Sequence, residues 1–128
     1  MWMFGGPSGG GVYQIFYDRG DPSEIDFLTP TFIADGVWHD LDLSGIVPHG
    51  SFAVLVRVRN GGASTATTFR FRKKGNVNAL NILDINQTAA NFNTYRDGIV
   101  FCDSNSVIQY ITPAGSGARE LTVRGWWK

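Results

Sequence analysis

The sequence is poor in the residues that build covalent and metal-based chemistry. Of its 128 residues, one is cysteine (Cys102) and two are histidine (His39 and His49). A single cysteine can form neither an intrachain disulfide nor a thiolate zinc site. So few reactive side chains also leave no convincing set of nucleophile, base and orienting group. We therefore predict that the protein is not an enzyme and that it holds no metal and no cofactor.

Long apolar runs and an excess of one charge are also missing. No stretch approaches the roughly 18 apolar residues that a membrane helix needs, and residues 1–11 lack the basic start and apolar run of a secretory signal. Basic and acidic residues both number 11, so the formal net charge is zero. That balance argues against a general electrostatic attraction to nucleic acid or to an anionic membrane. Neither is expected as a partner.

The chain does have enough apolar surface for one core. Apolar residues make up 43% and charged residues 17% of the sequence, which is typical of a folded domain. Residues 1–11 are rich in glycine and are predicted to form a flexible arm, and residues 12–128 are predicted to form a single domain. The arm carries Trp2 and Phe4, which we expect either to dock onto a surface or to belong to a partly ordered terminus.

Turn-forming residues recur at short intervals, and the runs between them alternate as β-strands do. In residues 51–59 every second side chain is a large apolar one, and in residues 67–73 phenylalanines alternate with arginines. A period of two residues is the pattern of a half-buried strand. These two runs are predicted to pair as a hairpin through a loop at 60–64.

Further runs predict the rest of an all-β fold. They are residues 12–17, 25–28, 37–43, 79–83, 99–102, 107–112 and 121–127. One short helix is expected within residues 86–95. About nine short strands in this length predict an antiparallel two-sheet sandwich of jelly-roll or Greek-key type.

The charges are segregated along the chain. Residues 1–50 carry seven acidic side chains and one basic one, and residues 51–128 carry ten basic and four acidic ones. Six of the bases fall on the predicted hairpin and are expected to project from one sheet face: Arg57, Arg59, Arg70, Arg72, Lys73 and Lys74. If residues 37–43 lie beside it, Asp40 and Asp42 neutralise the arginines across strands. Alternatively, separate acidic and basic patches dock copies side by side. A third interpretation is nucleic-acid binding, although these strands offer little aromatic surface for stacking.

Other polar residues and the cysteine have structural interpretations. His39 is in phase with apolar neighbours, so we expect a histidine at the edge of the core that makes one hydrogen bond. Cys102 lies in an apolar run and is expected to be a small buried hydrophobe. An oxygen-rich loop carries Asp18, Asp21, Glu24 and Asp26. Their spacing is not that of the known calcium loop, so a solvated acidic turn is expected there.

Aromatic residues are candidates for contact with a partner. Trp126 and Trp127 are adjacent, so in a strand one faces the core and the other faces solvent, a sugar or a second subunit. A platform for sugar rings could be built from Trp38, Trp126, Trp127, Tyr13, Tyr17, Tyr95 and Tyr110. The enrichment of tryptophan at protein contacts instead favours a role in the core and at an interface. The candidate partner-binding residues are Trp2, Phe4, Arg57, Arg59, Arg70, Arg72 and Trp126.

Several segments carry a resemblance to a known group of proteins. They are GVWHDLDLS (36–44), IVP (46–48), AVLVR (53–57), FRKKG (71–75), IVFCD (99–103), VIQY (107–110) and TVRGWW (122–127). Together they resemble small β-sandwich, jelly-roll-like modules of tailed-bacteriophage virions, which occur as capsid decoration or cement proteins and as tail-fibre tips. The resemblance covers roughly residues 36–128, and its motifs are structural rather than catalytic.

The resemblance implies a protein of the virion surface. We expect a homotrimer, made in the host cytoplasm, that binds the major capsid protein or another virion protein and stabilises the capsid by clamping neighbouring subunits. Because Met1 begins almost at the domain, a free-standing decoration protein is expected, with the arm as its docking or strand-exchange element. The alternative is a receptor- or carbohydrate-binding tip of a tail fibre that contacts a host-surface glycan.

Overall fold

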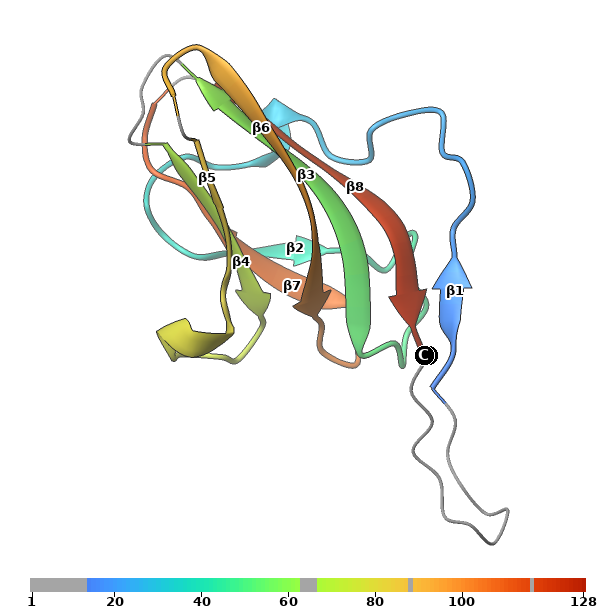
Figure 1. The fold of residues 1–128 in the computed structure, drawn as a ribbon. Helices are drawn as coiled ribbons and strands as arrows, with labels where there is room; N and C mark the ends of the chain where they lie inside the picture. Colours follow the sequence, from blue (N-terminus) through green and yellow to red (C-terminus); the bar gives the residue numbers. More distant parts are fainter. Residues whose placement is uncertain (1–13, 63–66, 88, 116) are drawn as a thin grey trace, which may run out of the picture.

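The structure is a computed structural model that describes residues 14–62, 67–87, 89–115 and 117–128. These residues contain eight β-strands and two short 3₁₀ helices (Figure 1). The strands are β1 (Phe16–Asp18), β2 (His39–Asp42), β3 (Ala53–Gly62), β4 (Thr68–Lys73), β5 (Leu83–Asn86), β6 (Phe92–Phe101), β7 (Val107–Ile111) and β8 (Gly117–Trp127). The 3₁₀ helices are η1 (Thr29–Thr31) and η2 (Ala79–Asn81).

The strands form two four-stranded antiparallel sheets that pack as a sandwich. One sheet has the order β1-β8-β3-β6 and the other the order β2-β7-β4-β5. The pairs are nested, because β1 pairs with β8, β2 with β7, β3 with β6 and β4 with β5. The chain is thus one long antiparallel hairpin that is rolled up, with consecutive strands in opposite sheets except at its tip, β4–β5. This is the jelly-roll arrangement, and the prediction of an all-β two-sheet sandwich is confirmed.

The predicted hairpin between residues 51–59 and 67–73 is wrong. Both runs are strands, β3 and β4, but β3 pairs with β6 and β8, whereas β4 pairs with β5 and β7. The two strands belong to opposite sheets. Alternation of side chains shows which face of a strand is apolar, but it carries no information on which strand lies beside it.

Two further expectations are corrected. The described residues hold eight strands rather than nine, because residues 25–28 contribute only one bridge, between Phe27 and Leu121. Residues 86–95, expected to include a helix, contain the end of β5 and the start of β6. Between these strands Asn91 has a φ of 56°, in the left-handed region that asparagine tolerates. Its N–H donates to the Gly62 carbonyl oxygen at 2.8 Å, which ties the start of β6 to the end of β3.

The core lies between the two sheets. Val54, Val56 and Val58 of β3 point inward and are fully buried, as are both phenylalanines of β4. The ring of Phe69 meets that of Phe32 edge-on, with centroids 4.8 Å apart. The alternation predicted for the two runs is confirmed, because their arginines occupy the intervening positions on the outer faces.

One charged side chain is buried inside the sandwich. Arg119 of β8 lies opposite Asn60 of β3 and is only 2% exposed. Its Nε donates to Thr112 Oγ1, but its Nη2 has no partner. None of the ion pairs among the described residues includes it. Burial lowers the pKa of the Arg119 guanidinium, yet an arginine in a protein stays charged, so this group opposes folding.

Candidate functional site

One end of the outer face of the β1-β8-β3-β6 sheet is apolar. A row across its four strands joins Phe16, Trp127, Ala53 and Phe101. The rings of Phe16 and Trp127 are in contact, with centroids 4.8 Å apart. Phe101 ends the row at the edge strand β6 and is 55% exposed. The row therefore leaves an aromatic side chain uncovered at the edge of the sheet.

A shallow hollow continues this apolar surface between β6 and η2. Leu80, Ile99 and Phe101 line it, and Leu80 is 92% exposed. Among the described residues β6 pairs only with β3, so its other edge offers unpaired backbone groups. We call Leu80, Ile99, Phe101 and this edge of β6 the apolar end. Large uncovered apolar surfaces often serve as contact sites in proteins, which makes the apolar end a candidate for such a site.

The other end of the same outer face is polar. Glu120 of β8 lies opposite Arg59 of β3, and Arg59 lies opposite Tyr95 of β6. Arg59 forms an ion pair with Glu120, and that hydrogen bond raises the pKa of the Arg59 guanidinium. In the next row, Arg57 lies opposite Asp97. The guanidinium carbons of Arg57 and Arg59 are 5.3 and 5.9 Å from the centre of the Tyr95 ring. We call these five residues the polar end.

Arg70 and Arg72 belong to the other sheet. Arg70 forms an ion pair with Asp84 of β5 at 2.7 Å. Arg72 donates to Gln109 Oε1 at 2.9 Å, and its guanidinium lies 4.0 Å from the centre of the Trp38 ring. The expectation that the arginines of residues 51–59 and 67–73 project from one sheet face is therefore wrong, because β3 and β4 are in different sheets.

Cross-strand neutralisation does occur, but with other partners than expected. Asp40 of β2 accepts hydrogen bonds from Lys74 Nζ at 2.7 Å and Gln109 Nε2 at 3.0 Å. Both contacts lower the pKa of Asp40, the one with Lys74 more strongly. β2 pairs with β7 and not with β4, so Asp40 meets this lysine rather than an arginine. Asp42 instead accepts from the backbone N–H of Ser44 at 2.8 Å.

The terminal tryptophans have different neighbours. Trp126 is half-buried, packs against the core, and stacks with Tyr17 at a centroid distance of 6.5 Å. Trp127 contacts Phe16 on the outer face. The part of Trp126 in partner binding stays a prediction. Trp2 and Phe4 lie outside the described residues.

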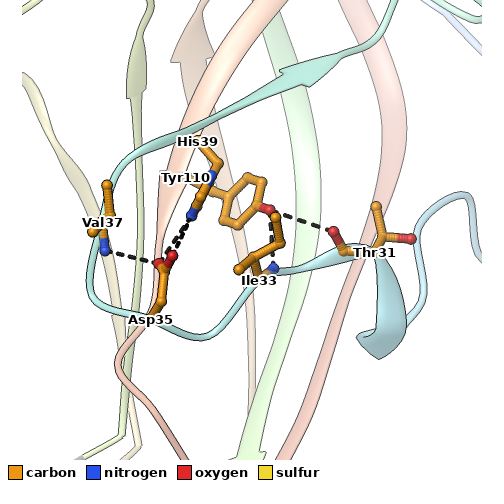
Figure 2. Close-up of polar contacts among 6 residues, drawn as sticks. All are labelled: Thr31, Ile33, Asp35, Val37, His39 and Tyr110. Carbon is orange, nitrogen blue, oxygen red and sulfur yellow. Dashed lines mark hydrogen bonds and ion pairs between the residues drawn. The ribbon is translucent and has the colours of Figure 1, made fainter.

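A histidine, a carboxylate and a tyrosine lie close together on the other sheet (Figure 2). His39 Nε2 is 2.9 Å from both carboxylate oxygens of Asp35. The hydrogen bond from His39 lowers the pKa of Asp35. Tyr110 Oη accepts from the Ile33 N–H at 3.0 Å and donates to the Thr31 carbonyl oxygen at 3.3 Å. The Tyr110 contacts fasten the segment before β2 onto β7, and the contact between Asp35 and His39 ties the same segment to β2.

The acidic loop at 18–26 is held by an internal ion pair. Arg19 forms two contacts with the Asp26 carboxylate, one of them at 2.8 Å from Nη2 to Oδ1. Asp21 and Glu24 line a hollow beside this pair. Within the described residues, no group of three or more His, Cys, Asp or Glu side chains is arranged to hold a metal ion.

Cys102 is a buried thiol. Its Sγ donates to the Ser51 carbonyl oxygen at 3.3 Å. Burial raises the pKa of this thiol to about 11. The thiolate, which is the reactive form of cysteine, is therefore scarce at neutral pH. The side chain is buried, as expected.

Sequence reasoning counted Tyr95 among the aromatic residues of a possible sugar platform, but it did not single out the other residues that dominate the two ends of the outer face. They are Leu80, Ile99, Phe101 and Glu120. Tyr95 fell inside the expected helix, and Glu120 preceded the predicted last strand. A signal was present, because Tyr95, Asp97, Ile99 and Phe101 occur at alternate positions, which is the pattern of one strand face.

Comparisons of this chain with protein-family models, with curated proteins and with solved structures find no match. No helix among the described residues is long and apolar enough to cross a bilayer. The geometry of the outer face is thus the basis for assigning a function.

Proposed function

We propose that this protein is a structural component of a virus particle, a capsid-decoration protein that works by protein–protein contact. Two observations support this. The described residues form a jelly roll, an architecture shared by viral capsid and lectin domains. The second is the motif pattern of roughly residues 36–128, from which we expected a virion surface module of tailed bacteriophages. The apolar end carries the proposal, because it is an uncovered contact surface at the edge of a sheet.

The apolar end fits another copy of the same chain. Ile99 and Phe101 are about half exposed and Leu80 almost fully exposed, so joining two surfaces removes apolar area from water. The chain has zero formal net charge, and copies without net charge have no long-range repulsion to overcome. The ten-residue edge strand β6 supplies unpaired backbone groups that can pair with a different edge of the next copy, as a closed ring of three requires. The homotrimer expected from the sequence is the assembly we propose.

Sedimentation equilibrium of the full chain tests this assembly. We expect the wild type to be a trimer and Phe101→Glu to be a monomer, because the new carboxylate must be desolvated in the contact. Val37→Glu is the matched control, since Val37 is 56% exposed in the segment leading to β2 of the other sheet. A monomeric wild type, or a Phe101→Glu protein that stays trimeric, contradicts the proposed contact.

Capsid binding is tested separately by cosedimentation. Capsids assembled without this protein are mixed with the purified chain and pelleted. We expect the wild type to pellet with the capsids and a form without residues 1–10 to remain in the supernatant, since Trp2 and Phe4 are the proposed docking side chains. Failure of the wild type to pellet contradicts a decoration role. Unchanged pelleting of the truncated form contradicts the role of the arm.

The alternative is a tail-fibre tip that binds a receptor or glycan on the host surface. The polar end favours it, because an exposed tyrosine lies there beside charged side chains. A fibre tip binds its host without the capsid, so labelled protein that binds host cells and does not pellet with capsids supports this alternative.

A further inference from the structure

A small hollow lies over the polar end. It has a volume of about 170 Å³ and is lined by Ile25, Arg57, Arg59, Tyr95, Glu120 and Thr122. Drug-sized ligands occupy pockets of roughly 300–1,000 Å³, so this one suits a single ring rather than an extended molecule. Its lining residues come from β3, β6 and β8 and, through Ile25, from the segment that bridges to β8.

Two arginines that line the hollow have N–H donors without a hydrogen-bond acceptor. The Arg57 guanidinium is 3.6 Å from Asp97 Oδ2, beyond hydrogen-bond range. Arg124 already contacts the same oxygen at 3.0 Å. Arg59 Nε is buried and has no partner. The buried Arg59 Nε is closed to solvent, so the donor that a ligand can reach is the half-exposed Arg57 guanidinium.

The lining of the hollow has a net positive charge. Its charged side chains are those of Arg57, Arg59 and Glu120. The lining therefore carries one net positive charge, on a chain whose formal net charge is zero. Guanidinium groups bind carboxylates through paired N–H donors. A carboxylate is therefore the anionic group that suits this lining.

Tyr95, Glu120 and Thr122 offer contacts for the uncharged part of such a ligand. Tyr95 is 52% exposed, and a rigid ring that is apolar on its face and polar at its tip is suited to covering the C–H face of a sugar. The Glu120 side chain is 10% exposed and is fixed by Arg59, so its carboxylate is a preorganised acceptor for ligand hydroxyls. Thr122 supplies a further hydroxyl at the rim of the hollow.

We propose that the polar end binds a saccharide that carries a carboxylate, with the carboxylate on Arg57 and the ring on Tyr95. This site is separate from the apolar end, so it does not depend on the proposed assembly or on capsid binding. It gives the protein a second activity, the recognition of an acidic sugar.

The test uses the ¹⁵N-labelled full chain and methyl glucuronide as the probe. We expect the amide signals of Arg57, Tyr95 and Thr122 to shift on titration, and methyl glucoside and acetate each to bind at least about tenfold more weakly, since each supplies only half of the contacts. Equal binding of the glucoside, or shifts confined to other parts of the protein, overturns the proposal. Tighter binding of a short glutamate peptide than of the glucuronide also overturns it.

Variants locate the contacts. Tyr95→Ala and Arg57→Gln should each weaken glucuronide binding about tenfold or more, and Tyr95→Phe, which keeps the ring, should preserve most of it. Arg70→Gln is the matched control, because Arg70 is a similarly exposed arginine on the other sheet. If Tyr95→Ala does not fold, Arg57→Gln decides the question at a surface position. Wild-type affinity in Arg57→Gln overturns the proposal.

Discussion

Arg19 and Asp26 together complete the backbone hydrogen bonding of one residue in the neighbouring strand. Arg19 Nη1 donates to the Val123 carbonyl oxygen at 3.0 Å, and Asp26 Oδ2 accepts from the Val123 N–H at 2.8 Å. β1 pairs with β8 only at residues 125–127, and Phe27 bridges to Leu121. The ion pair therefore fills the gap that the backbone leaves between these two stretches.

We predict that Asp26→Ala lowers the free energy of unfolding by about 1–3 kcal/mol, because it leaves the Val123 N–H without an acceptor. Asp21→Ala, in the same acidic loop, should change it by less than about 0.5 kcal/mol. Urea denaturation measures both. Equal effects of the two substitutions would show that the hydrogen bonds to the Val123 backbone do not contribute to the free energy of unfolding.

Arg119→Met should leave stability unchanged or raise it, by up to about 4 kcal/mol. The substitution keeps an unbranched chain in the same space and removes a buried charge that has no carboxylate partner. Thr112 Oγ1 keeps its bond to the Thr68 carbonyl oxygen. Denaturant unfolding checks this, with Arg70→Met as the exposed control. A loss of more than about 1 kcal/mol would show that the guanidinium is stabilised after all.

Gly125→Ala should destabilise the protein by about 1–3 kcal/mol. An added Cβ would lie 2.3 Å from Phe16 Cζ and 2.6 Å from the Tyr17 carbonyl oxygen, so β1 must move away from β8. Gly45→Ala is the control, because nothing lies within 4 Å of its added Cβ. Thermal unfolding compares the two, and similar melting temperatures would contradict close packing of β1 on Gly125.

Stability should fall on acidification below about pH 4, in part through Asp35 and Asp40. The pKa of each carboxyl is below the ordinary value of 3.8, through His39 and Lys74 respectively. A lowered folded pKa gives stabilisation that is fully present above the unfolded pKa and is lost as the pH falls through the folded pKa. Lys74→Gln should raise the pKa of Asp40 and leave that of Asp35 unchanged. His39→Ala should raise the pKa of Asp35 and leave that of Asp40 unchanged. Carboxyl ¹³C NMR titration measures both, and a shift of neither pKa would show that these contacts do not form in solution.

The sequence pattern predicted which way side chains of the candidate site point, but it did not predict which strands lie side by side. The alternation in residues 51–59 correctly placed Arg57 and Arg59 on an outer face, because side-chain direction in a strand depends only on position. It placed Arg70 and Arg72 on the same face, which was wrong, because strand pairing is not encoded in alternation. Tyr95 was named as part of a possible aromatic platform, but it was placed in a helix because two adjacent alanines and a phenylalanine before it resembled a helical turn, whereas β6 owes its extended form to pairing along β3.

The sequence by itself determined that this chain folds as a β-sandwich and which face of each main strand is buried, because a period of two residues and frequent turn residues act locally. Only the tertiary structure decided the nested pairing of the jelly roll. That pairing joins residues far apart in the chain, such as Arg59 with Glu120, and its energy comes from burying whole strand faces against each other. The juxtaposition of Tyr95, Arg57, Arg59 and Glu120 in one hollow follows from that pairing alone.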